Sequence, residues 1–205
     1  RWGHTDGNIN AEQLGVSAGA QQWRYDTRGV TGAAAPQGSA PVYAIDSSAL
    51  GGMYANRIRL VSTDAGVGVR MLGNAAANGQ DFSLSAAGRI ELNNAISAQR
   101  DILLASTSND AAALALTDAA LTSGRDTKLD ARQGGLAMQR TRVIAGGALG
   151  VNTAGNAGFD ASTLAAGSMS IASQGALNLG NSGVQASGDI RLASGGATTV
   201  GAGGA

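Results

Sequence analysis

A pair of apolar residues separated by one other residue recurs along the chain, usually after a polar turn. The second members of these pairs lie 24, 20, 25, 22, 20 and 21 residues apart. Alternation with a period of two indicates β-strands that bury one face. The pairs that define this first set of strands are Ile58/Leu60, Phe82/Leu84, Ile102/Leu104, Thr127/Leu129, Leu149/Val151, Met169/Ile171 and Ile190/Leu192.

Two more short alternating segments fit into each period. The second set consists of Val67/Val69, Ile90/Leu92, Leu114/Leu116, Leu136/Met138, Leu177/Leu179 and Thr198/Val200. The third set consists of Ile96/Ala98, Leu121/Ser123, Val143/Ala145, Leu164/Ala166 and Val184/Ala186. Insertions collect after the first strand, as in the sequence STSNDAAA from Ser106.

Three strands in every 20–25 residues, joined by turns too short for hairpins, predict a coil. One coil cannot bury its inner face, but stacked coils can. We therefore predict an all-β fold, a right-handed parallel β-helix of seven or eight coils that lie about 4.8 Å apart. The residues expected to stack in register and to be buried are Leu60, Leu84, Leu104, Leu129, Val151, Ile171 and Leu192.

Glycine and asparagine stand where this pattern needs turns. Because both tolerate left-handed backbone, sharp left-handed corners are the expected reason for them. The positions concerned are Asn93–Asn94, Gly124, Gly146–Gly147, Gly180–Asn181 and Gly188.

Residues 1–56 break the rhythm and are interpreted as a transition region, with one continuous domain of repeats over 57–205. Leu14–Val16 and Tyr43–Ile45 fit two successive strands, and residues 18–42 between them predict an excursion outside the helix. Aromatic residues of the excursion are expected to cover a side or end of the rod. The alternative is a binding surface formed by Trp23, Arg24 and Tyr25.

Composition excludes several classes of partner. Aromatic residues make up 3% of the chain and charged residues 14%, while glycine contributes 32 residues, so the core must be narrow and aliphatic. No run of 18 apolar residues occurs, so we expect no membrane insertion. The net charge is zero and the basic residues are scattered, so we expect no nucleic-acid partner.

The chain contains no cysteine, and two explanations remain open. A protein that crosses the outer membrane unfolded would avoid disulfides, and a cytosolic protein would also lack them. The sequence RWGHTDGNIN at the start is polar and unlike a signal peptide, so an excised piece of a longer protein is expected.

Catalytic chemistry has little support, so we expect no enzyme and no cofactor. A Ser-His-Asp triad would have to use His4, the one histidine, and a zinc site would need more ligands. A carbohydrate-active enzyme, the remote alternative, needs two positioned carboxylates, whereas Glu12 and Glu91 are the only glutamates.

Aspartates precede four of the first strands, at Asp81, Asp101, Asp126 and Asp189. Calcium could bridge the first three, which fall in consecutive coils. Arg100 and Arg125 stand directly beside two of them, and aspartate commonly closes turns by accepting backbone N–H groups. Turn closure is the favoured interpretation, and no metal site is predicted.

The segment YAIDSSALGGMYANRIRLVSTDAGVGVRMLG, from Tyr43 to Gly73, resembles the filamentous haemagglutinin family of two-partner secretion exoproteins. That family includes adhesins and contact-dependent growth inhibition exoproteins. The upstream VSAGAQQWRYD and later coils such as SAAGRIELNNAISAQRDILLAS are also similar to it, so the resemblance is expected over nearly the whole chain.

The resemblance implies a shaft segment of a very large exoprotein, secreted and displayed on the surface of a Gram-negative bacterium. The implied partners are an outer-membrane transporter during export, the rest of the same exoprotein stacked at both ends, and, for an adhesin, a receptor on a host or target cell. An adhesive module that acts through residues 18–42 is the alternative function.

Overall fold

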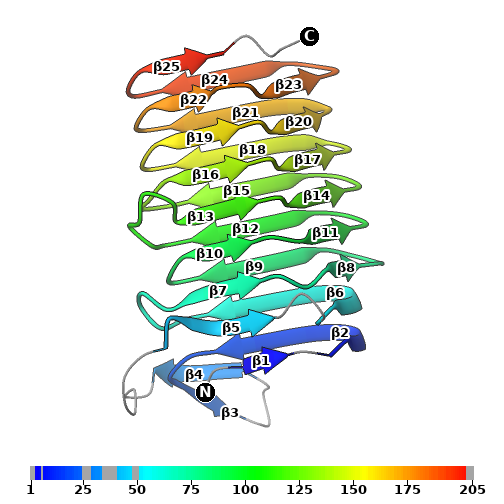
Figure 1. Ribbon diagram of the computed structural model, residues 1–205. Coiled ribbons are helices and arrows are strands. Elements are labelled where there is room, and N and C mark those ends of the chain that lie inside the picture. Colours follow the sequence, from blue (N-terminus) through cyan, green and yellow to red (C-terminus); the bar gives the residue numbers. More distant parts are fainter. Residues whose placement is uncertain (1–2, 6, 25–28, 34–40, 48–50, 202–205) are drawn as a thin grey trace.

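The protein folds as a rod of stacked β-coils. The computed structural model describes all residues except 1–2, 6, 25–28, 34–40, 48–50 and 202–205, and the described residues form strands and no helix. Figure 1 shows the coils stacked from the N-terminal end of the rod to the C-terminal end. Every strand pair of the rod is parallel, and three faces enclose one core.

The first face carries the first strands of the predicted coils. It contains the second halves of β2 (Ile9–Ala18) and β6 (Met53–Ser62), followed by β9 (Phe82–Ala86), β12 (Ile102–Ser106), β15 (Thr127–Ala131), β18 (Ala148–Thr153), β21 (Ser168–Ser173) and β24 (Ile190–Ser194).

The second face is a separate nine-stranded sheet. Its strands are β1 (Gly3–Thr5), β5 (Tyr43–Ser47), β7 (Gly68–Met71), β10 (Ile90–Leu92), β13 (Leu114–Thr117), β16 (Leu136–Gln139), β19 (Ala157–Asp160), β22 (Leu177–Leu179) and β25 (Thr198–Val200).

The third face joins the first through β2 and β6, which are long enough to bend around the corner between them. It continues with β8 (Ala75–Ala77), β11 (Ala95–Ala98), β14 (Ala120–Ser123), β17 (Arg142–Ala145), β20 (Thr163–Ala166) and β23 (Gly183–Ala186).

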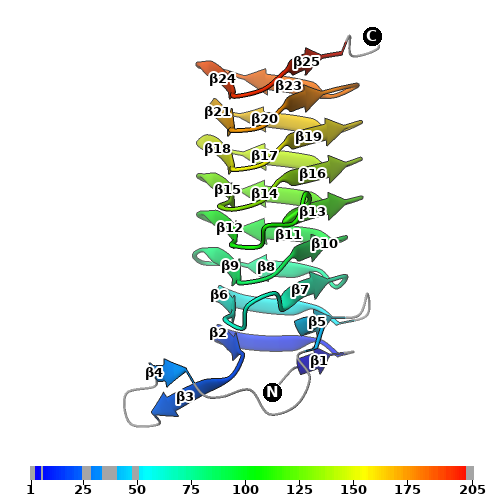
Figure 2. The same ribbon diagram turned by 90° about the vertical axis from the view of Figure 1, so that its left-hand side faces the viewer.

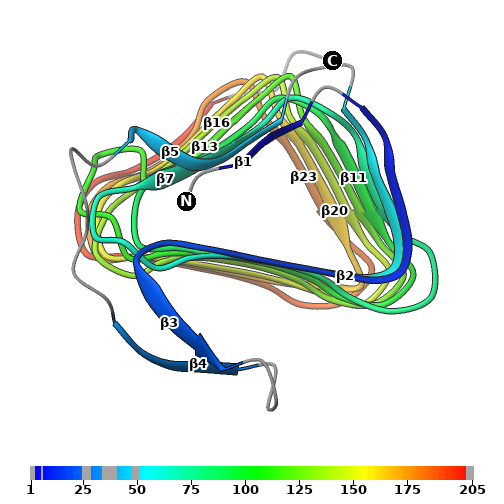
Figure 3. The same ribbon diagram turned by 90° about the horizontal axis from the view of Figure 1, so that it is seen from below.

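The helix is right-handed, as predicted. In the view from the N-terminal end, the chain runs clockwise through β1 and β2 while successive coils lie farther from the viewer (Figure 3). A right-handed connection between parallel strands is the usual hand in proteins. The fold class inferred from the period-two pattern is therefore confirmed.

The predicted aliphatic ladder runs through the first face in register. Leu84 pairs with Leu60 and Leu104, and Leu129 pairs with Leu104 and Val151. Six of the seven ladder residues are buried, with at most 1% of each exposed. For Leu192 the prediction of burial is wrong, because its strand β24 closes the C-terminal end and leaves it 41% exposed.

Three strands of the second and third faces were not predicted. The β8 strand consists of three alanines, and β19 has the sequence AGFD, so neither shows the alternation of two large apolar residues. The third, β1, lies at residues 3–5. Strands within residues 1–56 pair in register with later coils, whereas the boundary placed at 56/57 remains a prediction.

The left-handed backbone predicted for the turn residues is wrong for every predicted glycine and for Asn93–Asn94. Among the described residues, the glycines with positive φ are Gly19 and Gly66, and neither is one of the predicted positions. Gly124 is required instead because an added Cβ would collide with the carbonyl oxygen of Gln99 in the preceding coil, and Gly146 meets Gly124 in the same way. Close stacking of coils at a corner therefore selects glycine here.

Left-handed backbone is concentrated at the turns between the second and third faces. It occurs at Asp118, Arg140, Ala161 and Asn181, with φ between 47° and 52°. Only Asn181 was among the predicted turn residues. The corner thus repeats one backbone conformation in four successive coils while its residue type varies.

The predicted excursion is a two-stranded antiparallel ribbon of β3 (Gln21–Arg24) and β4 (Gly29–Ala33). It projects away from the rod near the N-terminal end (Figures 2 and 3). The N–H group of Ala20 donates to Asp64 Oδ1 over 2.7 Å, and the N–H group of Gly68 donates to the carbonyl of Val42 over 2.9 Å. One turn of the rod, residues 63–68, therefore holds both ends of the excursion.

Candidate functional site

A charged cluster on the outer side of the second face joins three successive strands. Arg70 on β7 donates from Nε and an Nη atom to the two carboxylate oxygens of Asp46 on β5, over 2.9 and 2.7 Å. Its guanidinium carbon lies 4.9 Å from the ring centroid of Tyr43. Glu91 on β10 forms an ion pair with Arg89 at 3.1 Å. The Arg70–Asp46 pair therefore ties two neighbouring coils together, and a hydrogen bond between Tyr43 and Glu91 reaches the third strand.

The titration behaviour of the cluster follows from these contacts. Burial raises the pKa of the Tyr43 phenol, and a hydrogen bond with Glu91 raises it further. The hydrogen bonds to Asp46 raise the pKa of Arg70. All of Tyr43, Asp46 and Arg70 fall in the segment that carries the resemblance to the exoprotein family. A structural role in stacking the coils accounts for these three residues.

The aspartates before the first strands form a hydrogen-bonded ladder between coils. Oδ1 of Asp81 accepts the N–H of Asp101 over 3.4 Å, and Oδ1 of Asp101 accepts the N–H of Asp126 over 3.1 Å. Asp126 in turn accepts the N–H of Ala148 over 2.8 Å. The aspartates thus accept backbone N–H groups, but the prediction that they close their own turns is wrong, because the donors belong to the next coil.

Arginines compensate the charge of this ladder. Arg100 Nε lies 3.4 Å from Asp81 Oδ1, and Arg125 Nε lies 3.8 Å from Asp101 Oδ1. Asp189 stands apart, largely exposed beside Arg191 at 4.0 Å. No group of three or more histidine, cysteine or acidic side chains that could hold a metal occurs among the described residues.

Removal of divalent cations is expected to leave the stability unchanged. Each carboxylate of the ladder already accepts a backbone N–H. Asp81 and Asp101 each also face an arginine. Thermal unfolding curves recorded with and without a chelator should therefore superimpose. A melting temperature lowered by several degrees in the chelator would instead show that calcium bridges the aspartates.

Another ion pair lies at the left-handed corner. Arg140 donates to both carboxylate oxygens of Asp118, over 2.6 and 2.8 Å. These hydrogen bonds lower the pKa of Asp118 below its ordinary value of 3.8. A lowered pKa in the folded state means that this contribution to stability is present above the ordinary pKa and is lost as the pH falls through the lowered one.

The Arg140→Asn variant is expected to return the Asp118 pKa to its ordinary range. Asparagine removes the guanidinium but tolerates the left-handed backbone of position 140. Carbon-detected NMR titration of the carboxylates measures this shift. An unchanged midpoint for Asp118 would show that Arg140 does not pair with it in solution.

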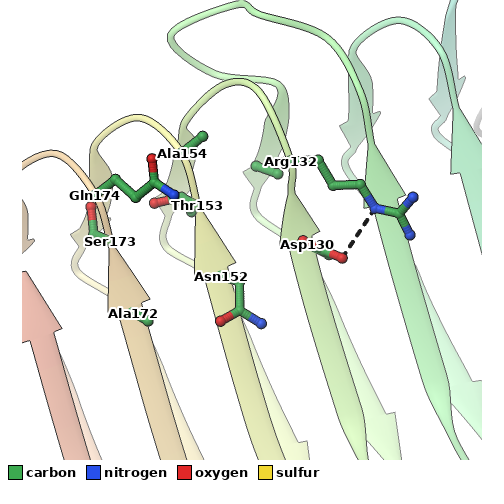
Figure 4. Close-up of a pocket in the computed structure, with 9 residues that line it drawn as sticks. Asp130, Arg132, Asn152, Thr153, Ala154, Ala172, Ser173 and Gln174 are labelled. Carbon is green, nitrogen blue, oxygen red and sulfur yellow. Dashed lines mark hydrogen bonds and ion pairs between the residues drawn. The ribbon is translucent and has the colours of Figure 1, made fainter.

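The outer corner between the first and second faces carries a hollow of about 300 Å³. It is lined by the last residues of β15, β18 and β21 and the first residues of the turns that follow (Figure 4). Lining residues include Asp130, Arg132, Asn152, Ala154, Ala172 and Gln174. None of these residues was predicted to form a site from the sequence. Aligning successive coils in register would have placed Asp130, Asn152 and Ala172 side by side.

Asp130 is the only carboxylate among the lining residues. Arg132 Nε lies 3.2 Å from its Oδ2, and Lys128 Nζ lies 3.9 Å from the same oxygen. Its side chain is 16% exposed, whereas that of Arg132 is 59% exposed. The hollow therefore presents a charge-compensated carboxylate beside two side-chain amides.

The structure places the sequence-predicted candidates apart. Glu12 lies on β2, whereas Glu91 lies on the second face, so the two glutamates do not form a carboxylate pair. His4 pairs through its backbone with Asp46, and Trp23 pairs through its backbone with Val30. The side chains of both lie outside the described part.

Of the remaining candidates in the excursion, Arg24 ends β3 with an exposed side chain. Tyr25 lies outside the described residues. The surface formed by Trp23, Arg24 and Tyr25 thus remains a prediction. No described segment forms a helix with the length and apolarity needed to cross a membrane.

Comparison with known proteins confirms the resemblance to the exoprotein family. The chain is 49% identical over 88 residues to a 16S rRNA endonuclease CdiA of Enterobacter cloacae, a match that covers 43% of this chain. It is 47% identical over 95 residues to a tRNA nuclease CdiA of Yersinia mollaretii, covering 46% of the chain. Filamentous hemagglutinin of Bordetella pertussis is 40% identical over 84 residues, covering 40% of the chain.

The matches are narrower than the resemblance implied. They cover less than half of this chain, not nearly all of it, and only 2–3% of the length of these relatives. No family model matches the chain, and no solved structure matches it significantly.

Proposed function

We propose that this chain is a shaft segment of a very large exoprotein that two-partner secretion exports to the surface of a Gram-negative bacterium. The observation that carries the proposal is the uninterrupted ladder of the first face, which continues in register from β2 to β24. A rod of this kind separates what lies at one end from what lies at the other. It needs no catalytic residue, and we propose no enzymatic activity for it.

The last coil of the rod supports continuation of the same fold. Ile190 and Leu192 on β24 occupy inner positions of the ladder but are 44% and 41% exposed. Val200 on β25 is exposed as well. A further coil with the same alternation would bury them, as Met169 and Ile171 are buried one coil earlier. The proposed partners are therefore the neighbouring coils of the same exoprotein, and a transporter during export.

Removal of one whole coil from the full exoprotein tests the shaft function. Deletion of residues 82–101 joins Asp81 to Ile102, leaves the residues that line the corner hollow in place, and keeps the register of the remaining coils, because Phe82 pairs with Ile102. Surface display and the activity of the distal region should persist. Deletion of residues 82–91 alone breaks the register and serves as the matched control, for which folding and display should fail.

The opposite result would contradict the shaft proposal. If the whole-coil deletion is displayed normally but abolishes binding or toxicity, this segment acts through its own surface and not as a spacer.

The projecting ribbon favours one alternative, an adhesive module that contacts host or neighbouring cells through residues 18–42. It stands away from the rod and is held at both ends, which suits a contact surface. Replacing residues 20–41 by a short Gly-Ser linker in the full exoprotein should abolish cell binding if this alternative holds. Trp23→Ala and Tyr25→Ala test the predicted contact residues individually.

A further inference from the structure

The hollow owes its shape to the order of side-chain sizes in two neighbouring columns of the first-face corner. Along the strand ends the column reads Asp130, Asn152, Ala172, and along the turns it reads Arg132, Ala154, Gln174. In the turn column the small Ala154 thus lies between two long polar side chains, and the strand column has the small Ala172 at one end, on coils about 4.8 Å apart. Figure 4 shows Ala154 between Gln174 and Arg132, and Ala172 at one end of the row formed with Asn152 and Asp130.

The lining chemistry excludes several ligand classes. Apart from alanine it contains no apolar side chain, so an apolar ligand would gain little there. A phosphate or a sulfate is disfavoured, because Arg132 is the only cation among the lining residues and it is already paired with Asp130, whose carboxylate would repel an anion. The strands β15, β18 and β21 are paired on both sides, so no free strand edge is available to an extended peptide.

The remaining groups match hydroxyl-rich ligands. A carboxylate accepts hydrogen bonds, a guanidinium donates them, and the amides of Asn152 and Gln174 each do both. Sugar hydroxyls also donate and accept, so neighbouring hydroxyls can bind a carboxylate and an amide together. The volume of about 300 Å³ is at the lower limit for small-molecule sites, which suits one sugar unit of a longer chain.

We infer that this corner hollow is a carbohydrate-binding site, with Asp130, Asn152 and Gln174 as the groups that contact the sugar. The open shape of a surface hollow holds one unit and lets the rest of a polysaccharide continue along the rod. Binding of a single unit is weak, with a dissociation constant on the order of 1 mM. Repeated contacts along a polymer would raise the overall avidity. The inference does not rest on the shaft function.

Saturation-transfer NMR on the 205-residue chain tests the site, with glucose, galactose, mannose, N-acetylglucosamine and glucuronic acid as the probes. At least one sugar should receive saturation from the protein. Ala172→Phe fills the hollow and Asn152→Ala removes an amide, so each should weaken the signal at least about tenfold. Ala137→Phe makes the same replacement on an outward position of the second face and should leave the signal unchanged.

Two results would overturn the inference. One is the absence of saturation transfer to all five sugars from a folded protein. The other is a signal that persists in Ala172→Phe at the level of Ala137→Phe, since the sugar would then contact another surface. Circular dichroism of each variant establishes that it is folded. Either of these two results would leave the coil-deletion experiment and the proposed shaft function unaffected.

Discussion

The Leu129→Ala variant is expected to lower the free energy of unfolding by about 2–5 kcal/mol, the range for large-to-small changes in a packed core. Leu129 is 0% exposed and pairs in register with Leu104 on one side and Val151 on the other. Because the stacked neighbours are held by strand pairing, the core cannot collapse around the missing side chain. Chemical denaturation followed by circular dichroism measures the change.

The chain supplies a matched control for this variant. Leu103 lies on the neighbouring strand β12 but points outward and is 40% exposed, so Leu103→Ala should cost less than about 1 kcal/mol. Equal destabilisation by Leu103→Ala and Leu129→Ala would show that the alternation along these strands does not separate an inner face from an outer one.

The first-face ladder could be predicted because its residues are large, aliphatic and spaced by two. Even Thr127, the one polar member, was placed correctly. It is buried, and its hydroxyl lies 2.8 Å from that of Ser123, which satisfies both groups inside the core. A small polar residue can therefore occupy an inner position where the end of the preceding strand supplies its hydrogen-bond partner.

The strand β8 was not predicted because it is built only from small residues, which also keep the rod narrow. Ala75 and Ala77 are buried in β8, but alanine stands on both inner and outer positions of that strand, so no alternation is visible. Only the register with Met53–Ala55 and with Ile96–Ala98 identifies its place. Information of this kind comes from neighbouring coils and not from the local sequence.

The roles of the polar corner residues also depend on contacts between coils. Asp81 and Asp101 were recognised as turn residues, yet the donors they bind lie 20 and 25 residues farther along the chain. Gly124 was recognised as a turn residue, yet the group it approaches is the carbonyl of Gln99 in the preceding coil. The hollow was missed altogether, since its lining residues come from three coils and share no local motif.

A disulfide between adjacent coils is expected to block export of the full exoprotein. Ser85 on β9 and Ala105 on β12 are register partners on neighbouring parallel strands, and strands at this spacing lie within the Cα separation that a disulfide needs. In the Ser85→Cys/Ala105→Cys variant, oxidation in the periplasm closes a loop before the chain reaches the transporter. If the chain must pass through the transporter unfolded, as we propose, most of the secreted protein should be lost under oxidising conditions and restored by a reductant.

Each single-cysteine variant is the matched control and should be secreted normally, which separates the effect of the cross-link from that of the substitution. Secretion of the cross-linked chain at the normal rate, with the disulfide formed before export, would refute unfolded passage and with it the explanation that this passage gives for a chain without cysteine.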